Sequence, residues 1–403
     1  MTSRRAFLGA LGASAAAQRL PERFWRAERG LAAPGDFLLE PGLVYVQTGS
    51  MGPSPRAVLD ATMRAWEALE RNPTFYGYGA HEQHLDVVRA QAARFVGARP
   101  SEVILTGSTT DGLNRVASAL APALTAGDRV LTTDQEHPGG RSCWDYLAKT
   151  RGVVIDEIAI TPGPFDAVAF LAQVRARLTP RTRVLSMAHV LSSTGVRLPV
   201  AELSRLARER GVLSVIDGAQ AVGGIAVNVH TLGCDVYATS GHKWLLGPKG
   251  TGLLIVRDDA SARVPLICRQ MGDAAYSGST GVTNLPGIFG FGAALDYLEG
   301  RGMAVVEAHN LALRDRAADA LRHLRQLQLV SDDTPGNRSP LVSYRLPKQV
   351  PAGALQQTLH EKHRVFVKVV PGTWFNGHRL SWHLFNNEQD VDRVAAALRA
   401  ELG

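Results

Sequence analysis

The sequence contains little cysteine. Only Cys143, Cys234 and Cys268 occur among 403 residues, and no two of them have the spacing of a metal-ligand pair. This argues against a zinc or iron–sulfur protein, and we expect no metal site. An odd number also leaves at least one thiol unpaired in an oxidising compartment. We expect the three side chains to be small buried residues without a chemical role.

Long apolar runs and clusters of one charge are also missing. The net charge is +7, but the arginines are spread along the chain, as in "LSRLARERG". An excess of positive charge can indicate binding to nucleic acid or an anionic surface. No Lys/Arg-rich tract or nucleic-acid-binding motif accompanies it, so we expect no such partner. No apolar run after the N-terminus is long enough for a membrane span, so we expect no stable membrane insertion.

The N-terminus reads "TSRRAFLGALGASAAA". Arg4 and Arg5 precede Phe7, Leu8 and a weakly apolar stretch of small residues, a pattern that resembles a twin-arginine export signal. The alternative is a chain start that carries two arginines by chance. The pattern predicts a signal peptide over residues 1–32, contact with the twin-arginine translocase during export, and a periplasmic location.

Between Val103 and Arg257, short apolar runs alternate with helical patterns. The candidate strands are "EVILTG", "DRVLTTD", "VVIDEIAI", "TRVLSMAHV", "GVLSVID", "DVYATS" and "GTGLLIV". The candidate helices cover 109–120, 166–178 and 199–210, where apolar residues recur three and four positions apart. This alternation predicts an α/β fold with a mostly parallel seven-stranded sheet between helices.

The pattern changes near residue 287 to longer helices and short strands such as "LVSYRL" and "FVKVV". We expect helices over 288–299, 303–327 and 388–402. The chain therefore divides into a large domain, 33–287, and a smaller α+β domain, 288–403. Ligands of such sheets bind beyond the carboxyl ends of the strands.

A carboxylate and an amine follow two of these strands. Asp217 ends a strand in "LSVIDGAQAVGG", and Lys243 follows the next strand in "TSGHKWLLGPKGTGLL". They could form an ion pair at the sheet rim. Alternatively, the amine could form a Schiff base with an aldehyde cofactor while the carboxylate keeps a ring nitrogen protonated. Pyridoxal phosphate is held in this way.

A phosphate group needs an anion site of its own. "LTGSTTDGLNRVA" places Ser108, Thr109 and Thr110 between a strand and a helix. Hydroxyls and free N–H groups at a helix N-terminus bind anions. Taken alone, the same stretch could simply cap the helix.

Together, "TGSTTDGLN", "DQEHPGG", "VIDGAQAV" and "TSGHKWLLGPKGTGLL" resemble the class V family of pyridoxal-phosphate enzymes. That family includes aminotransferases, cysteine desulfurases and isopenicillin N epimerase. The resemblance extends from about residue 40 to the end of the chain. It implies the fold type I transferase architecture and pyridoxal 5'-phosphate as cofactor.

The resemblance also implies a role for each matching residue. Lys243 would form the Schiff base and then carry the proton, Asp217 would pair with the ring nitrogen, and His137 would stack on the ring. The remaining cofactor contacts would come from Thr109, Thr110, Ser240 and His242 at the phosphate and from Gln220 near the ring hydroxyl. Arg379, in "GHRLSWHLFNN", would clamp the substrate carboxylate with its planar guanidinium.

The sequence departs from the family in several places. Desulfurases need a nucleophilic cysteine just before this arginine, but "VKVVPGTWFNGH" has none, so we do not expect a persulfide-type cysteine desulfurase. Ser192 stands where desulfurases have an asparagine at the cofactor. In "YSGSTGVTN", Thr280 or Thr283 would reach the phosphate of a partner subunit, which implies a homodimer with shared active sites. The residues expected at the substrate entrance, or else packed in the small domain, are Tyr76, Tyr78 and Trp374.

These observations predict an exported, aminotransferase-like enzyme acting at the Cα of an amino acid or aminoacyl substrate. The export signal also suggests a similarity to periplasmic enzymes that finish siderophore peptides such as pyoverdine. Epimerisation and C–S or β-elimination are alternative reactions, because the same residues support them. A non-catalytic pyridoxal-phosphate-binding protein is a further alternative.

Overall fold

The computed structural model describes residues 32, 35–80, 82–272, 276–277 and 279–403. The expected twin-arginine motif lies outside these residues, so it remains a prediction. Across the described residues, no helix combines the length and the apolar character that crossing a membrane requires.

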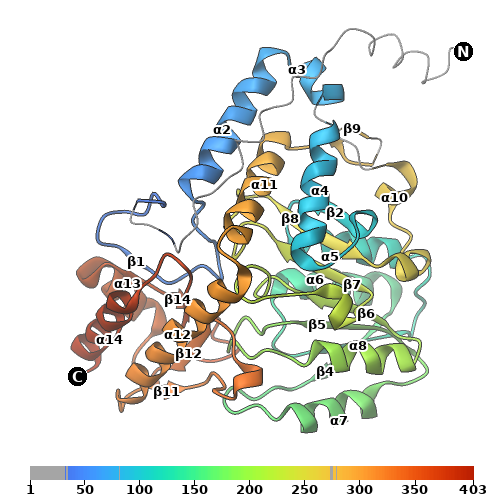
Figure 1. The fold of residues 1–403 in the computed structure, drawn as a ribbon. Helices are drawn as coiled ribbons and strands as arrows, with labels where there is room; N and C mark the ends of the chain where they lie inside the picture. Colours follow the sequence, from blue (N-terminus) through green and yellow to red (C-terminus); the bar gives the residue numbers. More distant parts are fainter. Residues whose placement is uncertain (1–31, 33–34, 81, 273–275, 278) are drawn as a thin grey trace, which may run out of the picture.

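A seven-stranded sheet forms the centre of the molecule (Figure 1). Its strands, in spatial order, are β2 (Val103–Thr106), β8 (Gly252–Val256), β7 (Val236–Ser240), β6 (Leu213–Asp217), β5 (Thr182–Ala188), β3 (Arg129–Thr133) and β4 (Val154–Ile158). β8 runs antiparallel to both of its neighbours, and the other six strands all run in one direction. The predicted mostly parallel α/β sheet is confirmed.

Helices cover both faces of this sheet because alternate residues of each strand point to opposite sides. Leu254 and Val256 of β8 pack with α5 (Thr109–Leu120) and α6 (Pro138–Arg151). Leu253 and Ile255 pack on the other side with α4 (Glu82–Val96) and α11 (Leu285–Glu299). α2 (Arg56–Arg71) packs on α11. Further along the same face, the sheet is covered by α7 (Ala167–Arg177) and α8 (Val200–Glu209).

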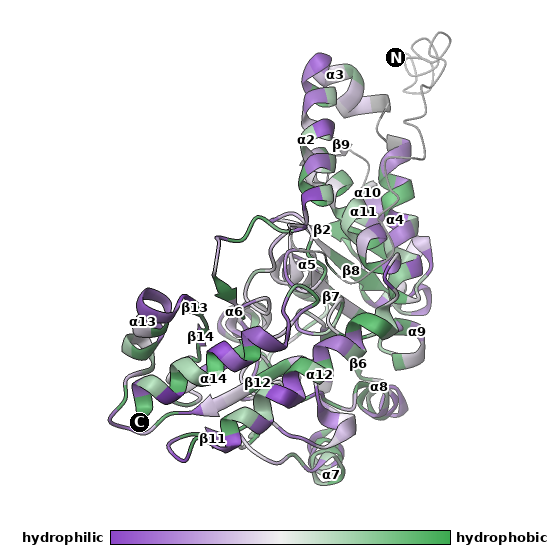
Figure 2. Ribbon diagram, turned by 60° about the vertical axis from the view of Figure 1, so that its left-hand side comes forward, coloured by the Kyte–Doolittle hydropathy of each residue, from purple (hydrophilic) through white to green (hydrophobic). Residues whose placement is uncertain are grey.

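The C-terminal unit is a four-stranded antiparallel sheet backed by helices. Its strands, in spatial order, are β11 (Gln328–Leu329), β12 (Leu341–Arg345), β15 (Gly377–Ser381) and β14 (Lys368–Val369), and its helices are α12 (Met303–Arg322), α13 (Ala352–His363) and α14 (Glu388–Leu402). β1 (Val44–Tyr45) pairs with β13 (Val365–Phe366), so this early segment packs with the C-terminal unit. Figure 2 shows apolar and polar bands side by side on α12 and α14.

The remaining short elements connect these units. They are α3 (Pro73–Phe75), the π-helical turn η2 (Tyr76–Ala80), α9 (Val229–Leu232), α10 (Ile267–Met271), β9 (Tyr276–Ser277), β10 (Gly281–Val282) and the 3₁₀ turns η3 (Pro100–Glu102), η4 (Asp258–Arg263) and η5 (Pro335–Asn337). The domain division expected at residue 287 remains a prediction, although α11, which spans it, packs on α2 and α4.

Serine hydroxyls join the two units. Ser343, Ser331 and Ser339 of the C-terminal unit donate to the backbone carbonyls of Ser193, Thr194 and Gly195 respectively, and we call these six residues the serine seam. The φ of Gly195 is +77°, and a Cβ there would lie 2.6 Å from the Cβ of Leu341. This position therefore requires glycine.

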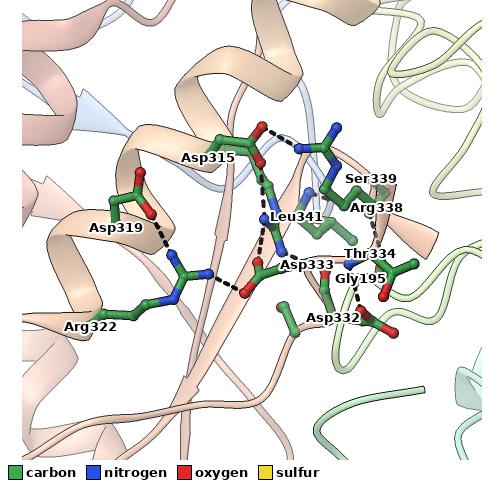
Figure 3. Close-up of polar contacts among 12 residues, drawn as sticks. Gly195, Asp315, Asp319, Arg322, Asp332, Asp333, Thr334, Arg338, Ser339 and Leu341 are labelled. Atoms are coloured by element: carbon green, nitrogen blue, oxygen red, sulfur yellow. Dashed lines mark hydrogen bonds and ion pairs between the residues drawn. The ribbon is translucent and has the colours of Figure 1, made fainter. Parts of the chain in front are cut away.

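An ion-pair cluster lies beside the serine seam (Figure 3). The Arg314 guanidinium, which is 1% exposed, pairs with Asp315 and Asp333 and also donates to the carbonyl of Asp332. Arg338 shares Asp315. The cluster neutralises the buried guanidinium and fixes the loop that carries Ser331 and Ser339.

Candidate functional site

The amine and the carboxylate singled out in the sequence lie at the carboxyl edge of the central sheet. Asp217 is the last residue of β6, and Lys243 follows Ser240, the last residue of β7. Burial lowers the pKa of Lys243 to about 8, although the negative charge of Asp217 raises it. Burial likewise raises the pKa of Asp217, against the opposing effects of Lys243 and of the Ala219 N–H, which donates to it at 2.9 Å. Both groups are buried and interact electrostatically, and we call the region between them and Arg379 the cleft.

Hydroxyl groups gather where β7 ends and α5 begins. The Thr109 N–H donates to Ser240 Oγ at 3.0 Å, and the two hydroxyl oxygens are 2.8 Å apart. A Cβ on Gly139 would lie 2.5 Å from Thr110 Oγ1, so the N-termini of α5 and α6 converge here. Nδ1 of His242 is buried and has no hydrogen-bond partner within the described chain. Hydroxyls, helix N-termini and a buried ring nitrogen without a partner together suit a phosphate group.

Arg379 lies on the opposite wall of the cleft, in β15, and is 2% exposed. Its Nη1 donates to the carbonyl and hydroxyl oxygens of Ser192 at 2.9 and 2.8 Å, and its Nη2 donates to Ser50 Oγ at 3.2 Å. None of these acceptors is a carboxylate. Burial lowers the pKa of Arg379 to about 10, so the group stays charged near neutral pH. A buried guanidinium with only neutral partners is suited to bind a carboxylate.

The segment 47–54 crosses the cleft between these walls. The Gly52 N–H donates to the carbonyl of His242 at 2.8 Å, and a Cβ on Gly52 would overlap the carbonyl oxygen of Lys243. Nε2 of Gln220 donates to the Gly49 carbonyl at 2.7 Å, while its Oε1 accepts from Trp244 Nε1 at 2.9 Å. The Gln220 side-chain amide thus links the segment 47–54 to Trp244. Its expected place beside a ring hydroxyl stays a prediction.

His137 lies at the N-terminus of α6, with Nδ1 accepting from the Gly139 N–H at 3.0 Å. Burial and the charges of Lys243, Arg379 and Lys368 lower the pKa of His137 to about 4. The imidazole is therefore neutral near pH 7. A neutral ring can lie against a flat aromatic ligand without adding charge. The stacking role expected for His137 stays a prediction.

Glu136 belongs to the same cleft, although the sequence did not single it out. Its Oε1 accepts from the Thr133 hydroxyl at 2.7 Å and from the N–H of Ala188 at 3.2 Å. Ala188 is the partner of Asp217 across β5 and β6. Burial and the charge of Asp217 raise the pKa of Glu136 to about 8. In the sequence, its only signal is its position before His137 in "DQEHPGG".

The other predicted residues lie at different places. Thr280 lies in the turn between β9 and β10, with its Oγ1 2.8 Å from Ser277 Oγ. Tyr76 and Tyr78 belong to η2, which follows α3 at the top of Figure 1. Trp374 donates from Nε1 to the Asp134 carbonyl at 3.2 Å and so bridges the C-terminal unit to the loop before His137.

Metal-ligand clusters are absent from the part of the chain that the structure describes. The three cysteines are buried, as expected, and form no disulfide with one another, and burial raises the pKa of both Cys143 and Cys234 to about 12. Neither of these two thiols is a reactive thiolate at neutral pH.

Comparisons with known proteins find similar sequences over most of the chain. The family described as "Aminotransferase class-V" matches residues 44–394. Isopenicillin N epimerase of Amycolatopsis lactamdurans is 33% identical over 382 residues, which cover 90% of this chain and 96% of the relative. The Streptomyces clavuligerus isopenicillin N epimerase is 31% identical, covering 92% and 98%. A Salmonella typhimurium cysteine desulfurase is 28% identical, covering 88% and 92%.

Solved structures show the same fold. A cysteine desulfurase from Thermococcus onnurineus has a TM-score of 0.79 at 23% identity, covering 91% of this chain and 96% of that one. A mutant of C-DES with glycine covalently linked to its pyridoxal-phosphate cofactor has a TM-score of 0.78 at 25% identity, covering 90% and 97%. The predicted fold type I architecture is confirmed.

Proposed function

Because the chain belongs to the class V aminotransferase family and depends on pyridoxal phosphate, we propose that it breaks the Cα–H bond of an amino acid or aminoacyl group. Amino transfer is the reaction we favour. The observation that carries the proposal is the juxtaposition of Lys243 and Asp217 with Arg379, a buried cation that has only neutral hydrogen-bond partners. The first two suit an aldehyde cofactor, and the third suits the carboxylate of its substrate.

The residues of the cleft fit this cofactor. Lys243 would attach it, Asp217 would face its ring nitrogen, and His137 would cover its ring. Its phosphate would be held by Thr109, Thr110, Ser240 and His242. When bound, pyridoxal phosphate supplies an electron-deficient ring that stabilises negative charge at the substrate Cα.

The protein groups then supply binding and proton transfer. Arg379 would bind the substrate α-carboxylate through its guanidinium, in addition to or in place of the Ser192 and Ser50 oxygens that it now contacts. The amine of Lys243, with a pKa of about 8, would remove the Cα proton and return it, because a base works best when its pKa is near the working pH. The segment 47–54 would restrict access of water to these atoms.

Epimerisation is the second candidate, since two relatives at 33% and 31% identity are isopenicillin N epimerases. In that reaction the proton would return to Cα from the opposite face, and the amine would stay on the substrate. C–S or β-elimination is a further alternative that the same groups can support. Persulfide-type desulfuration is disfavoured, because the interval from Lys368 to Arg379 contains no cysteine.

We further propose export by the twin-arginine route, a periplasmic location and a homodimer in which Thr280 or Thr283 reaches the partner's phosphate site. The support is the paired Arg4 and Arg5 before a weakly apolar stretch and the family's shared active sites. An aminoacyl residue of a siderophore peptide would suit an enzyme in that compartment. Fusing residues 1–35 to a reporter tests export. Export that continues after replacing both arginines by lysine would contradict the twin-arginine route.

The enzymatic proposal is tested by incubating purified holoenzyme with amino acids and short peptides, with and without a 2-oxo acid acceptor. We expect a change in the visible spectrum, a keto product, and an amino group on the acceptor. Lys243→Ala should abolish all three, while Lys348→Ala, at an exposed lysine, should retain them. Inverted chirality with the amine retained would instead establish epimerisation, and released ammonia would establish elimination. A coloured protein inert to every substrate would be a non-catalytic binder.

A further inference from the structure

Three residues form one row across the sheet of the C-terminal unit. In the antiparallel register, Arg379 of β15 faces Ser343 of β12 on one side and Lys368 of β14 on the other. Directly opposed residues point to the same face of a sheet. The neighbouring His378 and Leu380 point to the other face, where His378 contacts Tyr344 within the apolar core. The row therefore faces the large domain and the cleft.

Two members of this row are already engaged in contacts with the large domain. Ser343 donates to the Ser193 carbonyl at 2.8 Å, and Arg379 donates to Ser192. The third member, Lys368, is partly buried, and its ammonium group makes no hydrogen bond or ion pair within the described chain. Its charge acts on Arg379 and His137, and burial lowers its own pKa. An uncompensated ammonium group thus lies beside the carboxylate-binding arginine.

The basic side chains of the cleft outnumber the acidic ones, which favours the binding of a second anion. Lys243, Arg379 and Lys368 are basic, and the acidic groups near them are Asp217 and Glu136, of which Glu136 has a pKa of about 8. The phosphate of the cofactor would bind at Thr109 and Ser240, at the other end of the cleft. One α-carboxylate would occupy Arg379 and leave Lys368 without an anion.

We propose that Lys368 forms a second anion subsite next to Arg379, and that the substrate accordingly carries a second acidic group beyond its α-carboxylate. An acidic amino acid, or an aminoacyl group with a free side-chain carboxylate, has this chemistry. The inference rests on the proposed function for the identity of the first site. Cross-strand neighbours have Cβ atoms about 5 Å apart, and the flexible lysine stem adapts to acids separated by a few carbons.

The test compares acids of equal length that differ in one carboxylate. Glutarate and pentanoate carry no amino group, so their binding to holoenzyme is measured by calorimetry without any reaction. L-Glutamate and L-glutamine are titrated in parallel through the visible spectrum of the cofactor. We expect the diacid of each pair to bind about tenfold more tightly, as one charge-assisted contact allows, and the preference to fall as salt is added.

Two variants assign the preference to one side chain. K368Q should remove it, so that glutarate and pentanoate bind alike, while K348Q, at an exposed lysine of the same unit, should keep it. An unchanged melting temperature and cofactor content of K368Q ensure that the loss is local. The inference is overturned if the wild type shows no preference, if K368Q retains it, or if K368Q weakens both acids equally.

The two proposals fail separately. If glutarate binds through Lys368 but no amino acid changes the spectrum, the second subsite stands and the proposed reaction falls. If amino acids react without regard to a second carboxylate, the proposed reaction stands and the subsite falls.

Discussion

The protonation states of Lys243 and Asp217 depend on each other. Burial favours the neutral amine, and the nearby carboxylate favours the ammonium, so the pKa of Lys243 settles at about 8 instead of its ordinary 10.5. A substantial fraction of this side chain is therefore an uncharged nucleophile at moderately alkaline pH. In an exposed lysine, only a very small fraction of the amine would be uncharged at the same pH.

Capture of pyridoxal phosphate by the apoprotein should follow this titration. Its rate should rise as the pH passes through about 8 and level off above it, because only the neutral amine attacks the aldehyde. Asp217→Asn removes the charge that stabilises the ammonium, so the pKa of Lys243 falls and the midpoint moves to lower pH. Stopped-flow absorbance measures both curves.

The control for that prediction is Glu202→Gln, which removes an exposed carboxylate on α8 and should leave the midpoint where it is. A wild-type midpoint near 10 would contradict the expected effect of burial. So would an Asp217→Asn midpoint above that of the wild type.

Among single residues, the sequence predicts as site residues those that directly follow a recognisable strand. Asp217 and Lys243 stand at strand ends, and parallel strands bring their carboxyl ends to one edge. The role expected for Arg379 followed only from the family resemblance. Lys368 could not be found in this way, because a lysine in "FVKVV" resembles an ordinary exposed strand residue. Its significance depends on the β14–β15 register, which joins segments that the sequence leaves unpaired.

Among the elements, the segment 47–54 has the greatest influence on the cleft. It lies across Lys243 at Gly52, and its Ser50 and Gly49 contact Arg379 and Gln220. Lys249 Nζ donates to the Gly52 carbonyl at 2.8 Å, which helps to hold the segment in place. The absence of a side chain at residue 52 allows this close approach.

Gly52→Ala should disturb the cleft, because the new Cβ would overlap the backbone of Lys243. We expect cofactor affinity to fall at least about tenfold and stability to fall by about 1–3 kcal/mol, the usual cost of overpacking. Absorbance titration and thermal unfolding measure the two effects. Gly353→Ala in α13 is the matched control, since its Cβ would meet no atom within 4 Å. Equal cofactor affinity in both variants would show that the segment does not shape the site.

The sequence predicts elements well where local signals agree. The helix expected over 109–120 is α5, whose cap Ser108 accepts from the Asp111 N–H at 3.1 Å. The helix expected over 303–327 ends earlier, at Arg322, and this expectation was wrong at its C-terminus. Leu324 and Leu327 form tight turns there, and Leu324 is buried in the core of the C-terminal unit. Tertiary packing decides that boundary, and helical periodicity does not show it.

For the whole molecule, the serine seam connects the two units close to Arg379. Its carbonyls, Ser193 to Gly195, directly follow Ser192, which accepts two hydrogen bonds from Arg379. Hydroxyl donors on three successive carbonyls leave the loop little freedom to shift. The position of Arg379 relative to the large domain is thereby fixed.

Replacing Ser331, Ser339 and Ser343 together by alanine should uncouple the units. Each buried carbonyl left without a donor costs about 1–3 kcal/mol, so calorimetry should show a lower first transition and two separate unfolding steps. Ser204→Ala is the control, because that hydroxyl donates only to Val200 within α8, at 2.7 Å. A single transition at the temperature of the control would rule out this coupling role.

The contact between Ser50 and Arg379 joins residues that are 329 positions apart. On the ribosome, Asp217 and Lys243 emerge long before β15 has been translated, so a nascent polypeptide carries its reactive amine while one wall of the pocket is still missing. The pocket can consequently be completed only after translation has passed codon 379. A message that stops before codon 379 yields a product without the guanidinium that would orient its substrate.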